Sequence, residues 1–217
     1  MKEKGLLLGI LAFTVLVLSI SFSPGNVKVV EVAKPVVVKE NPMNMDKFIN
    51  DLGMIESRNN YDAKRNKSQY WGKYQLGTLA RVTVGIDTIQ WETFKSDTSL
   101  QDAAVMVYLL KIKERLTNHM YPDSTMRNFI EEFSGTVVGN YNITESGLIG
   151  MAHNCGVTST KIFLISGGRI VPVDGLGTPA TKYLTLANYE IDMTLEEAER
   201  KLKFVLFTNK INSFLQI

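Results

Sequence analysis

Apolar side chains after residue 45 recur at intervals of three and four residues, and this period constrains the fold more than any other feature. Such spacing places the side chains on one face of an α-helix. A first helix is predicted from about Met45, with Asn44 or Asp46 as its N-cap. Its apolar stripe consists of Phe48, Ile49, Leu52 and Ile55.

Four more segments carry helix signals. A helix is predicted over about 99–117, and another begins near Thr144. "TSTKIFLISGG" predicts a helix that Gly167 and Gly168 end, and "TLEEAERKLKFVLF" opens with a capping box of Thr194 and Glu197. Because sustained strand alternation is scarce, the fold class is predicted to be mainly α.

The first 44 residues differ from the rest of the chain. "MKEK" precedes an uncharged apolar run at 5–22, whose length is at the lower limit for crossing a membrane. We interpret residues 1–23 as a signal anchor, or as a signal peptide if it is cleaved. Residues 24–44 are rich in Pro, Val and Lys and predict an extended linker. The chain is thus expected to be exported, and either anchored to the membrane facing the periplasm or cell exterior, or secreted.

Composition excludes several classes of protein. The formal net charge of +2 is too small to indicate a nucleic-acid partner. One cysteine cannot form an intramolecular disulfide, and two histidines make a dedicated zinc site improbable. We therefore expect a domain held together by its apolar core, with no metal.

Glu56 falls at the edge of the first apolar stripe, where the predicted helix ends. A partly desolvated carboxyl holds its proton toward neutral pH, as the general acid of glycosidic cleavage must. The loop that follows is basic, aromatic and rich in amides, which suits a sugar polymer that carries carboxylates. Its candidate sugar contacts are Tyr61, Tyr70, Trp71, Tyr74, Asn59, Asn60 and Gln75. The residues alone also allow a solvated helix-end acid beside core aromatics.

The order of four short motifs resembles the soluble lytic transglycosylase family, which is related to goose-type lysozyme. The motifs are "IES", "GKYQLG", "MAHNCG" and a later tyrosine in "GTPATKYLTLA". They match Glu56 and Ser57, then Gly72 and Gln75, then Ala152, Asn154 and Gly156, and Tyr183. Tyr74 stands where the family usually has Met, and His153-Asn154-Cys155 where it often has Tyr-Asn-Ala.

This resemblance implies a lysozyme-like helical domain over 45–190, whereas the predicted C-terminal helical extension at 191–217 lies outside the match. Glu56 would be the catalytic acid that cleaves the bond between N-acetylmuramic acid and N-acetylglucosamine in peptidoglycan, forming 1,6-anhydro ends. Ser57 would support the backbone around the acid or contact the glycan, and no cofactor is implied. The implied substrate-binding residues are Ser57, Tyr74, Gln75, His153, Asn154 and Tyr183.

Three alternatives remain open at the level of sequence. A hydrolytic muramidase would need a second carboxylate, for which Asp62 is the nearest candidate. A cysteine peptidase would need Cys155 with His119, because His153 lies two positions away on a helix and points elsewhere. A wall-binding or assembly protein on the same scaffold would have lost the chemistry.

Overall fold

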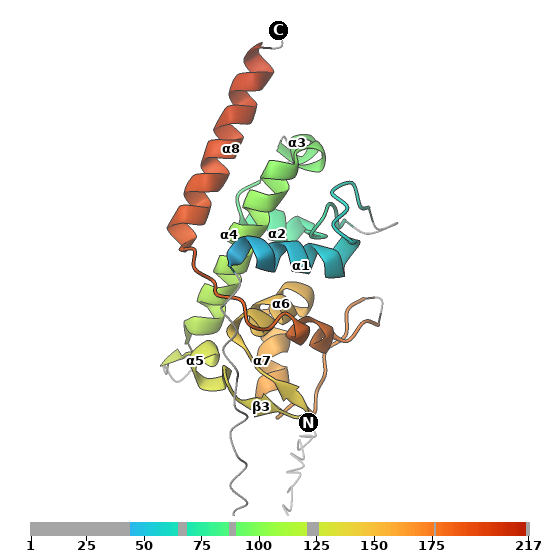
Figure 1. The fold of residues 1–217 in the computed structure, drawn as a ribbon, viewed down its shortest axis with the longest axis vertical. Coiled ribbons are helices and arrows are strands. Elements are labelled where there is room, and N and C mark those ends of the chain that lie inside the picture. The colour runs from blue at the N-terminus through green and yellow to red at the C-terminus, as the bar shows by residue number, and fades with distance from the viewer. Residues whose placement is uncertain (1–43, 65–68, 87–89, 121–125, 176, 216–217) are drawn as a thin grey trace, which may run out of the picture. The chain divides into compact units, whose positions relative to one another are not determined.

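The structure is a computed structural model, and it describes residues 44–64, 69–86, 90–120, 126–175 and 177–215. This part of the chain is mainly helical, as predicted, with short two-stranded pairs at its edges (Figure 1). The helices are α1 (Met45–Ser57), α2 (Thr78–Thr83), α3 (Gln90–Ser96), α4 (Thr98–Thr117), α5 (Phe129–Phe133), α6 (Glu145–Cys155), α7 (Val157–Ile165), the 3₁₀ helix η1 (Ala180–Thr185) and α8 (Leu195–Leu215). The strands are β1 (His119–Met120), β2 (Met126–Arg127), β3 (Val137–Val138) and β4 (Tyr141–Asn142).

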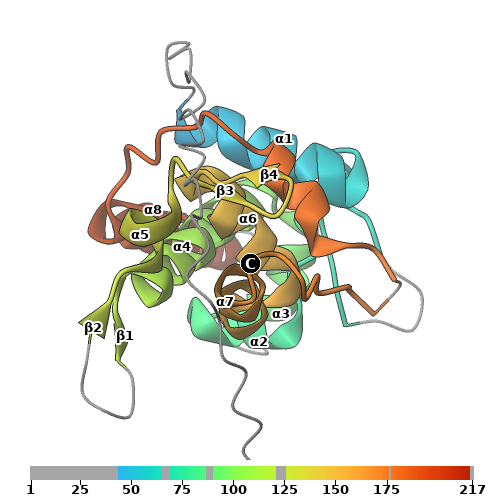
Figure 2. The same ribbon diagram turned by 90° about the horizontal axis from the view of Figure 1, so that it is seen from below.

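Helix α4 is the centre of the core. Asp97 caps its start by accepting a hydrogen bond from the Leu100 N–H, which supplies one of the bonds missing at a helix N-terminus. Apolar side chains lie on nearly all sides of α4, so the helix is buried by neighbours around it. Helices α1, α2, α3, α5, α6, α7 and α8 all contact it (Figures 1 and 2).

Helix α1 begins and ends as its sequence predicts. Asn44 accepts from the Lys47 N–H at the start, and Phe48 and Leu52 are fully buried. Arg58 adopts a left-handed conformation at the end, and its N–H returns to the carbonyls of Gly53 and Met54. This cap places Glu56 in the last turn of the helix.

Helices α6 and α7 confirm two further predicted segments. Thr144 caps α6, and Gly167 and Gly168 follow α7 with positive φ angles. Gly150 of α6 lets η1 approach closely, because a Cβ there would lie 2.8 Å from a methyl carbon of Leu186. This close contact brings the segment that carries Tyr183 against α6.

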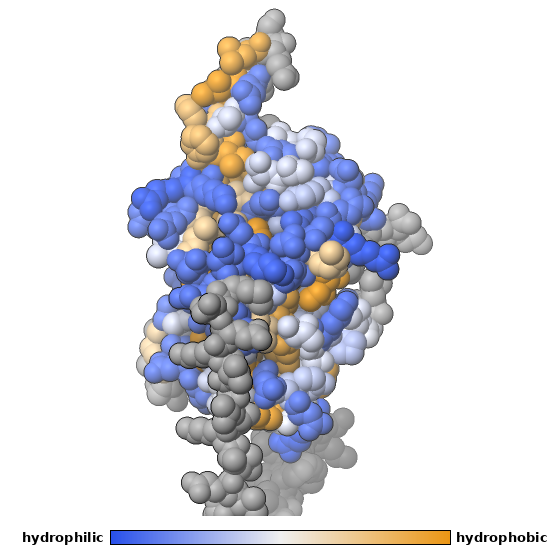
Figure 3. All heavy atoms as spheres, viewed as in Figure 1, coloured by the Kyte–Doolittle hydropathy of each residue, from blue (hydrophilic) through white to orange (hydrophobic). Residues whose placement is uncertain are grey.

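Helix α8 confirms the predicted capping box. The Thr194 N–H donates to the Glu197 carboxylate, and the Glu197 N–H donates to the Thr194 hydroxyl. The helix runs antiparallel to α4, since Lys201 contacts Met106 and Asn209 contacts Asp97. Its last turns continue past the start of α4 (Figure 1). Figure 3 shows hydrophobic surface on that end of the helix.

The predicted apolar run at 5–22 and the linker up to residue 43 lie outside the described residues. Among the helices that the structure does describe, none is long and apolar enough to cross a membrane. Export and anchoring therefore stay predictions from sequence.

Candidate functional site

Glu56 is almost completely enclosed by side chains from two other elements. Its side chain is 5% exposed. The Tyr183 hydroxyl of η1 donates a hydrogen bond of 2.7 Å to Glu56 Oε1. His153 Nε2 of α6 lies 3.4 Å from the same oxygen. Figure 2 shows η1, drawn in orange, beside α1. The structure thus gathers α1, α6 and η1 around one carboxyl group.

Asn154 extends this arrangement. Its Nδ2 donates to the Tyr183 hydroxyl at 3.3 Å, which in turn donates to Glu56. The Asn154 Oδ1 is buried and accepts no hydrogen bond. A buried acceptor without a donor costs free energy unless a ligand or water supplies one. The free oxygen of Asn154 is therefore a candidate ligand contact.

His153 links the acid to the loop after α1. Its Nε2 lies 3.1 Å from the Tyr74 carbonyl oxygen, which can only accept, so we assign the proton to Nε2. The other ring nitrogen, Nδ1, is buried without a hydrogen-bond partner. The Tyr108 ring of α4 meets the imidazole edge-on, with the ring centroids 5.9 Å apart.

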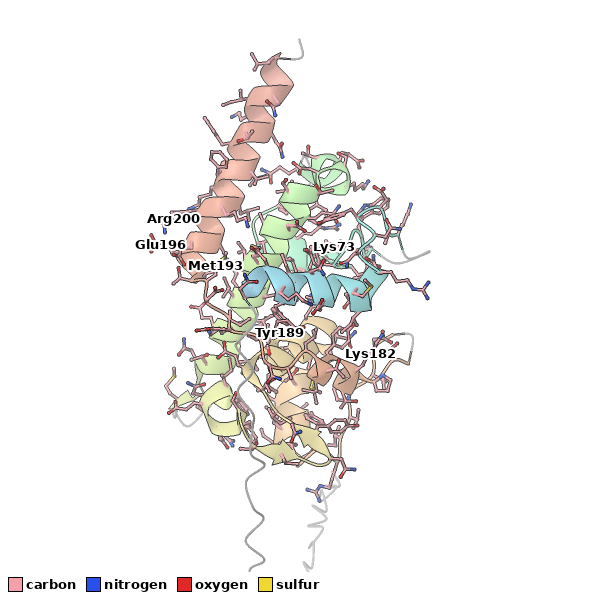
Figure 4. All side chains as sticks on the ribbon, in the orientation of Figure 1. Lys73, Lys182, Tyr189, Met193, Glu196 and Arg200 are labelled. Carbon is pink, nitrogen blue, oxygen red and sulfur yellow. The ribbon has the colours of Figure 1, made fainter. Side chains whose placement is uncertain are left out.

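Two clefts meet at this site. The first, of about 620 Å³, is lined by the last turn of α1, including Glu56, and by Arg58 and Lys182. The second, of about 580 Å³, is lined by residues of the loop, α2, α4 and α6, among them His153 and Asn154. Because Glu56 and His153 are in contact, the walls of the two clefts join at this pair. Figure 4 labels Lys182, which η1 contributes to the first cleft.

Gln75 lines the second cleft. Its backbone has a left-handed φ of 49°, and its Nε2 donates to the carbonyls of Gly72 and Ala63. These bonds hold the amide in place, while its Oε1 is buried and accepts nothing. We call Glu56, Gln75, His153, Asn154 and Tyr183 the cleft cluster.

A second set of hydrogen-bonded polar side chains lies beneath the loop. Asp102 of α4 accepts hydrogen bonds from the hydroxyls of Tyr61 and Tyr74, at 2.9 and 2.6 Å. Lys73, labelled in Figure 4, has a side chain that is 7% exposed and lies over both tyrosine rings. Gln101 bonds the backbone of Lys73 and Tyr61. We call Tyr61, Lys73, Tyr74, Gln101 and Asp102 the scaffold cluster.

The scaffold cluster changes the interpretation of the aromatic loop. The Tyr74 ring is 1% exposed and lies in the core, so the structure offers its carbonyl, not its ring, to the site. Burial, together with the Asp102 carboxylate, raises the pKa of Tyr61 to about 12 and raises that of Tyr74 further. Of the four loop aromatics, Tyr70 lines the described part of the second cleft.

Ser57 ties the end of α1 to the loop. Its Oγ donates to the Lys73 carbonyl at 2.8 Å and accepts from the Asn60 N–H. It also lines the first cleft. This position agrees with a supporting role for the backbone around Glu56, and its contact with a glycan stays a prediction.

Of the two competing residues, Cys155 lines the second cleft beside Asn154, whereas Asp62 lines neither described cleft. Burial raises the pKa of the Cys155 thiol, whose neighbours are Thr160 and the Gly156 carbonyl. A thiol kept protonated is a weak nucleophile. Asp62 is exposed. Among the described residues that line the two clefts, Glu56 is the single carboxylate.

Sequence reasoning missed Asp102, Tyr108 and Lys182. Asp102 and Tyr108 sit in an apolar helix whose pattern gives no sign of a polar network. Lys182 resembles an ordinary surface cation until the fold places it on the first cleft with Arg58, a cation of the basic loop that the sequence did single out. Within the described ranges, no group of three or more His, Cys, Asp or Glu residues could hold a metal ion.

Comparisons with known proteins returned no match: no family model, no curated protein and no solved structure is similar to this chain.

Proposed function

We propose that this protein cleaves the glycan strands of peptidoglycan between N-acetylmuramic acid and N-acetylglucosamine, as a lytic transglycosylase with a lysozyme-like helical domain. One observation carries the proposal. Glu56 is enclosed at the junction of two clefts, with Tyr183 and His153 on one of its oxygens. Removal of water favours the neutral, proton-bearing form of a carboxyl group, which is the form a general acid needs.

The chemistry requires one carboxyl group that acts twice. Glu56 donates its proton to the glycosidic oxygen as the bond to C1 of the muramic acid breaks. The resulting carboxylate then accepts the proton of the same sugar's 6-hydroxyl, whose oxygen bonds to C1 and closes the 1,6-anhydro ring. Glu56 is regenerated and no water is consumed. The Tyr183 hydroxyl stabilises the carboxylate between the two steps.

The clefts provide matching groups for such a strand. Arg58 and Lys182 in the first cleft suit the carboxylates of muramic acid and of its peptide. The unpaired oxygens of Gln75 and Asn154 suit the N–H of an acetamide or a sugar hydroxyl. Tyr70 offers an exposed ring on which a sugar can stack.

The number of carboxylates that line the described clefts favours transglycosylation over hydrolysis. An inverting hydrolase needs a second carboxylate about 6.5–9.5 Å from the acid, and a retaining one needs a nucleophile about 5–5.5 Å away. Among the described residues lining the clefts there is no carboxylate besides Glu56. Attack by the sugar's own hydroxyl requires none.

Product analysis tests the proposal. We expect the full chain to clear purified wall in a zymogram and to release muropeptides with 1,6-anhydro ends, one water lighter than hydrolysis products. Asp62→Asn should retain this activity. Reducing ends together with an inactive Asp62→Asn variant would establish a muramidase instead. Binding of wall without any cleavage would leave only a wall-binding protein.

We also propose, from the sequence of residues 5–22, that the chain is exported and held at the membrane with its catalytic domain outside. Cell fractionation and N-terminal sequencing test this. A soluble mature protein beginning near Pro24 or Lys34 would show that the segment is a cleaved signal.

A further inference from the structure

Helix α8 has apolar side chains on two opposite sides. Ala198 and Leu202 face the core and are nearly inaccessible to water. On the other side a second stripe faces solvent, with spacings of three, four and four residues. Its members and their exposed fractions are Phe204 70%, Phe207 62%, Ile211 41% and Leu215 78%. A helix that is apolar on both sides is normally covered on both.

The stripe extends beyond the body of the domain. Asn209 reaches Asp97, the residue that caps α4, so the turns after it have no part of α4 beside them. Figure 3 shows hydrophobic surface on this projecting end. Among the described residues, no part of α4 covers the last turns of α8, so a partner could contact these turns.

The charge of this segment limits the partner. The acids of α8 are confined to its first turns, at Glu196, Glu197 and Glu199. From Arg200 to Ile217 there is no acid, and the basic residues are Arg200, Lys201, Lys203 and Lys210. Figure 4 shows Arg200 on the side of α8 that faces away from α4. The exposed stripe therefore lies in a segment without acids, which contains Lys210 and directly follows Arg200, Lys201 and Lys203.

A second copy of the chain fits this segment poorly. In either orientation of the two helices, the segments 204–215 would face each other with cations and no acids. Stable helix pairs place opposite charges beside their apolar seam. A soluble polyanion would be attracted by the basic residues, but it would leave the side chains of Phe204 and Phe207 in water.

We propose that the C-terminal half of α8 lies in the interface of an anionic lipid bilayer, with the stripe Phe204, Phe207, Ile211 and Leu215 inserted among the acyl chains. A bilayer supplies both the apolar depth and the negative surface that this helix requires. In this arrangement the helix lies in the plane of the interface and does not cross the bilayer. None of the described helices is long and apolar enough to do so. This surface is separate from the clefts and does not depend on the proposed cleavage.

The test reports on α8 itself, since the segment 5–22 could bind membranes independently. The full chain carries Cys155→Ser and Asn212→Cys, with an environment-sensitive fluorophore at residue 212. Vesicles of phosphatidylcholine are compared with vesicles that also contain phosphatidylglycerol. We expect a blue shift with the anionic vesicles alone. No shift on vesicles to which the chain demonstrably binds would overturn the proposal, as would an equal shift on both kinds.

Matched variants separate the contributions. Phe204→Ser with Phe207→Ser should abolish the shift, whereas Ile165→Ser with Ile170→Ser removes two apolar side chains elsewhere that are each 56% exposed, and it should not. Lys203→Glu should weaken binding roughly 30-fold, since it changes the charge by two at the surface. Far-UV circular dichroism checks that each variant folds. A shift without vesicles that grows with protein concentration would mean self-association and refute the lipid assignment.

Discussion

The scaffold cluster and the cleft cluster share one loop but differ in how their polar atoms are satisfied. Tyr61, Lys73 and Tyr74 direct their polar groups to Asp102 and to one another. One position later, Gln75 presents a buried oxygen without a donor, and Asn154 does the same across the second cleft. Each cluster contains one carboxylate, and the side chain of Glu56 is 5% exposed whereas that of Asp102 is 32% exposed.

The difference between the clusters separates support from function. A closed network of hydrogen bonds stabilises a loop and has no capacity left for a ligand. Unpaired buried acceptors lower stability and persist where a ligand completes them. Substitutions in the scaffold cluster should therefore change unfolding, whereas substitutions in the cleft cluster should change activity.

The largest effect is expected from Glu56→Gln. The amide keeps the shape of the side chain but cannot donate an acidic proton, so wall cleavage should fall by at least about 10²–10⁴-fold. The urea midpoint of unfolding should stay close to that of the parent chain. Glu196→Gln, on the exposed start of α8, is the matched control and should be fully active. Undiminished clearing of wall by the Glu56→Gln variant would show that Glu56 is not the catalytic acid.

Asp102→Asn should cause the largest loss of stability. Asparagine cannot balance the enclosed Lys73 ammonium, and its NH₂ group replaces the oxygen Oδ2 that accepts the second contact of the Tyr61 hydroxyl. Because the Asp102 side chain is 32% exposed, we expect about 1–3 kcal/mol, less than for a fully buried pair. Urea denaturation measures it, with exposed Asp62→Asn as the control. An unchanged unfolding free energy would contradict the supporting role of the cluster.

Tyr183→Phe should lower activity about tenfold, since it removes one hydrogen bond to the catalytic carboxyl. Tyr189→Phe is a closely matched control, because the Tyr189 hydroxyl donates to another carboxylate of α1, Asp51. Neither Tyr189 nor Asp51 lines a described cleft. That control should lose about 1 kcal/mol of stability and no activity. If both variants lost activity equally, the effect would come from displacement of α1 and not from Glu56.

Cys155→Ser should have the smallest effect, within about twofold in activity. Burial raises the pKa of the thiol, so the parent protein should also react slowly with iodoacetamide near neutral pH. The rate of alkylation, compared with that of a free cysteine, checks this. Loss of cleavage on alkylation and in Cys155→Ser would instead favour a cysteine nucleophile.

Local sequence predicted the five longer helices α1, α4, α6, α7 and α8, whereas the short helices α2, α3, α5 and η1 were not predicted. Asn44, Thr144 and the Thr194–Glu197 pair cap helices where their side chains predict, because a cap involves residues only two or three positions apart. The apolar period of α1 selects its buried face for the same reason, whereas α4 is buried on nearly all sides. The glycines after α7 likewise end it through their own backbone freedom.

Only the tertiary structure decided what the polar side chains do. Tyr183 reaches Glu56 across 127 positions of sequence, and Tyr61 and Tyr74 reach Asp102 across 41 and 28. No periodic pattern encodes such contacts, so the loop aromatics were open to either a sugar-binding or a core interpretation. The exposed stripe of α8 has the same origin. Periodicity indicates that Phe204 and Phe207 are helical, but the length and position of α4 decide which side of α8 is covered and which side faces solvent.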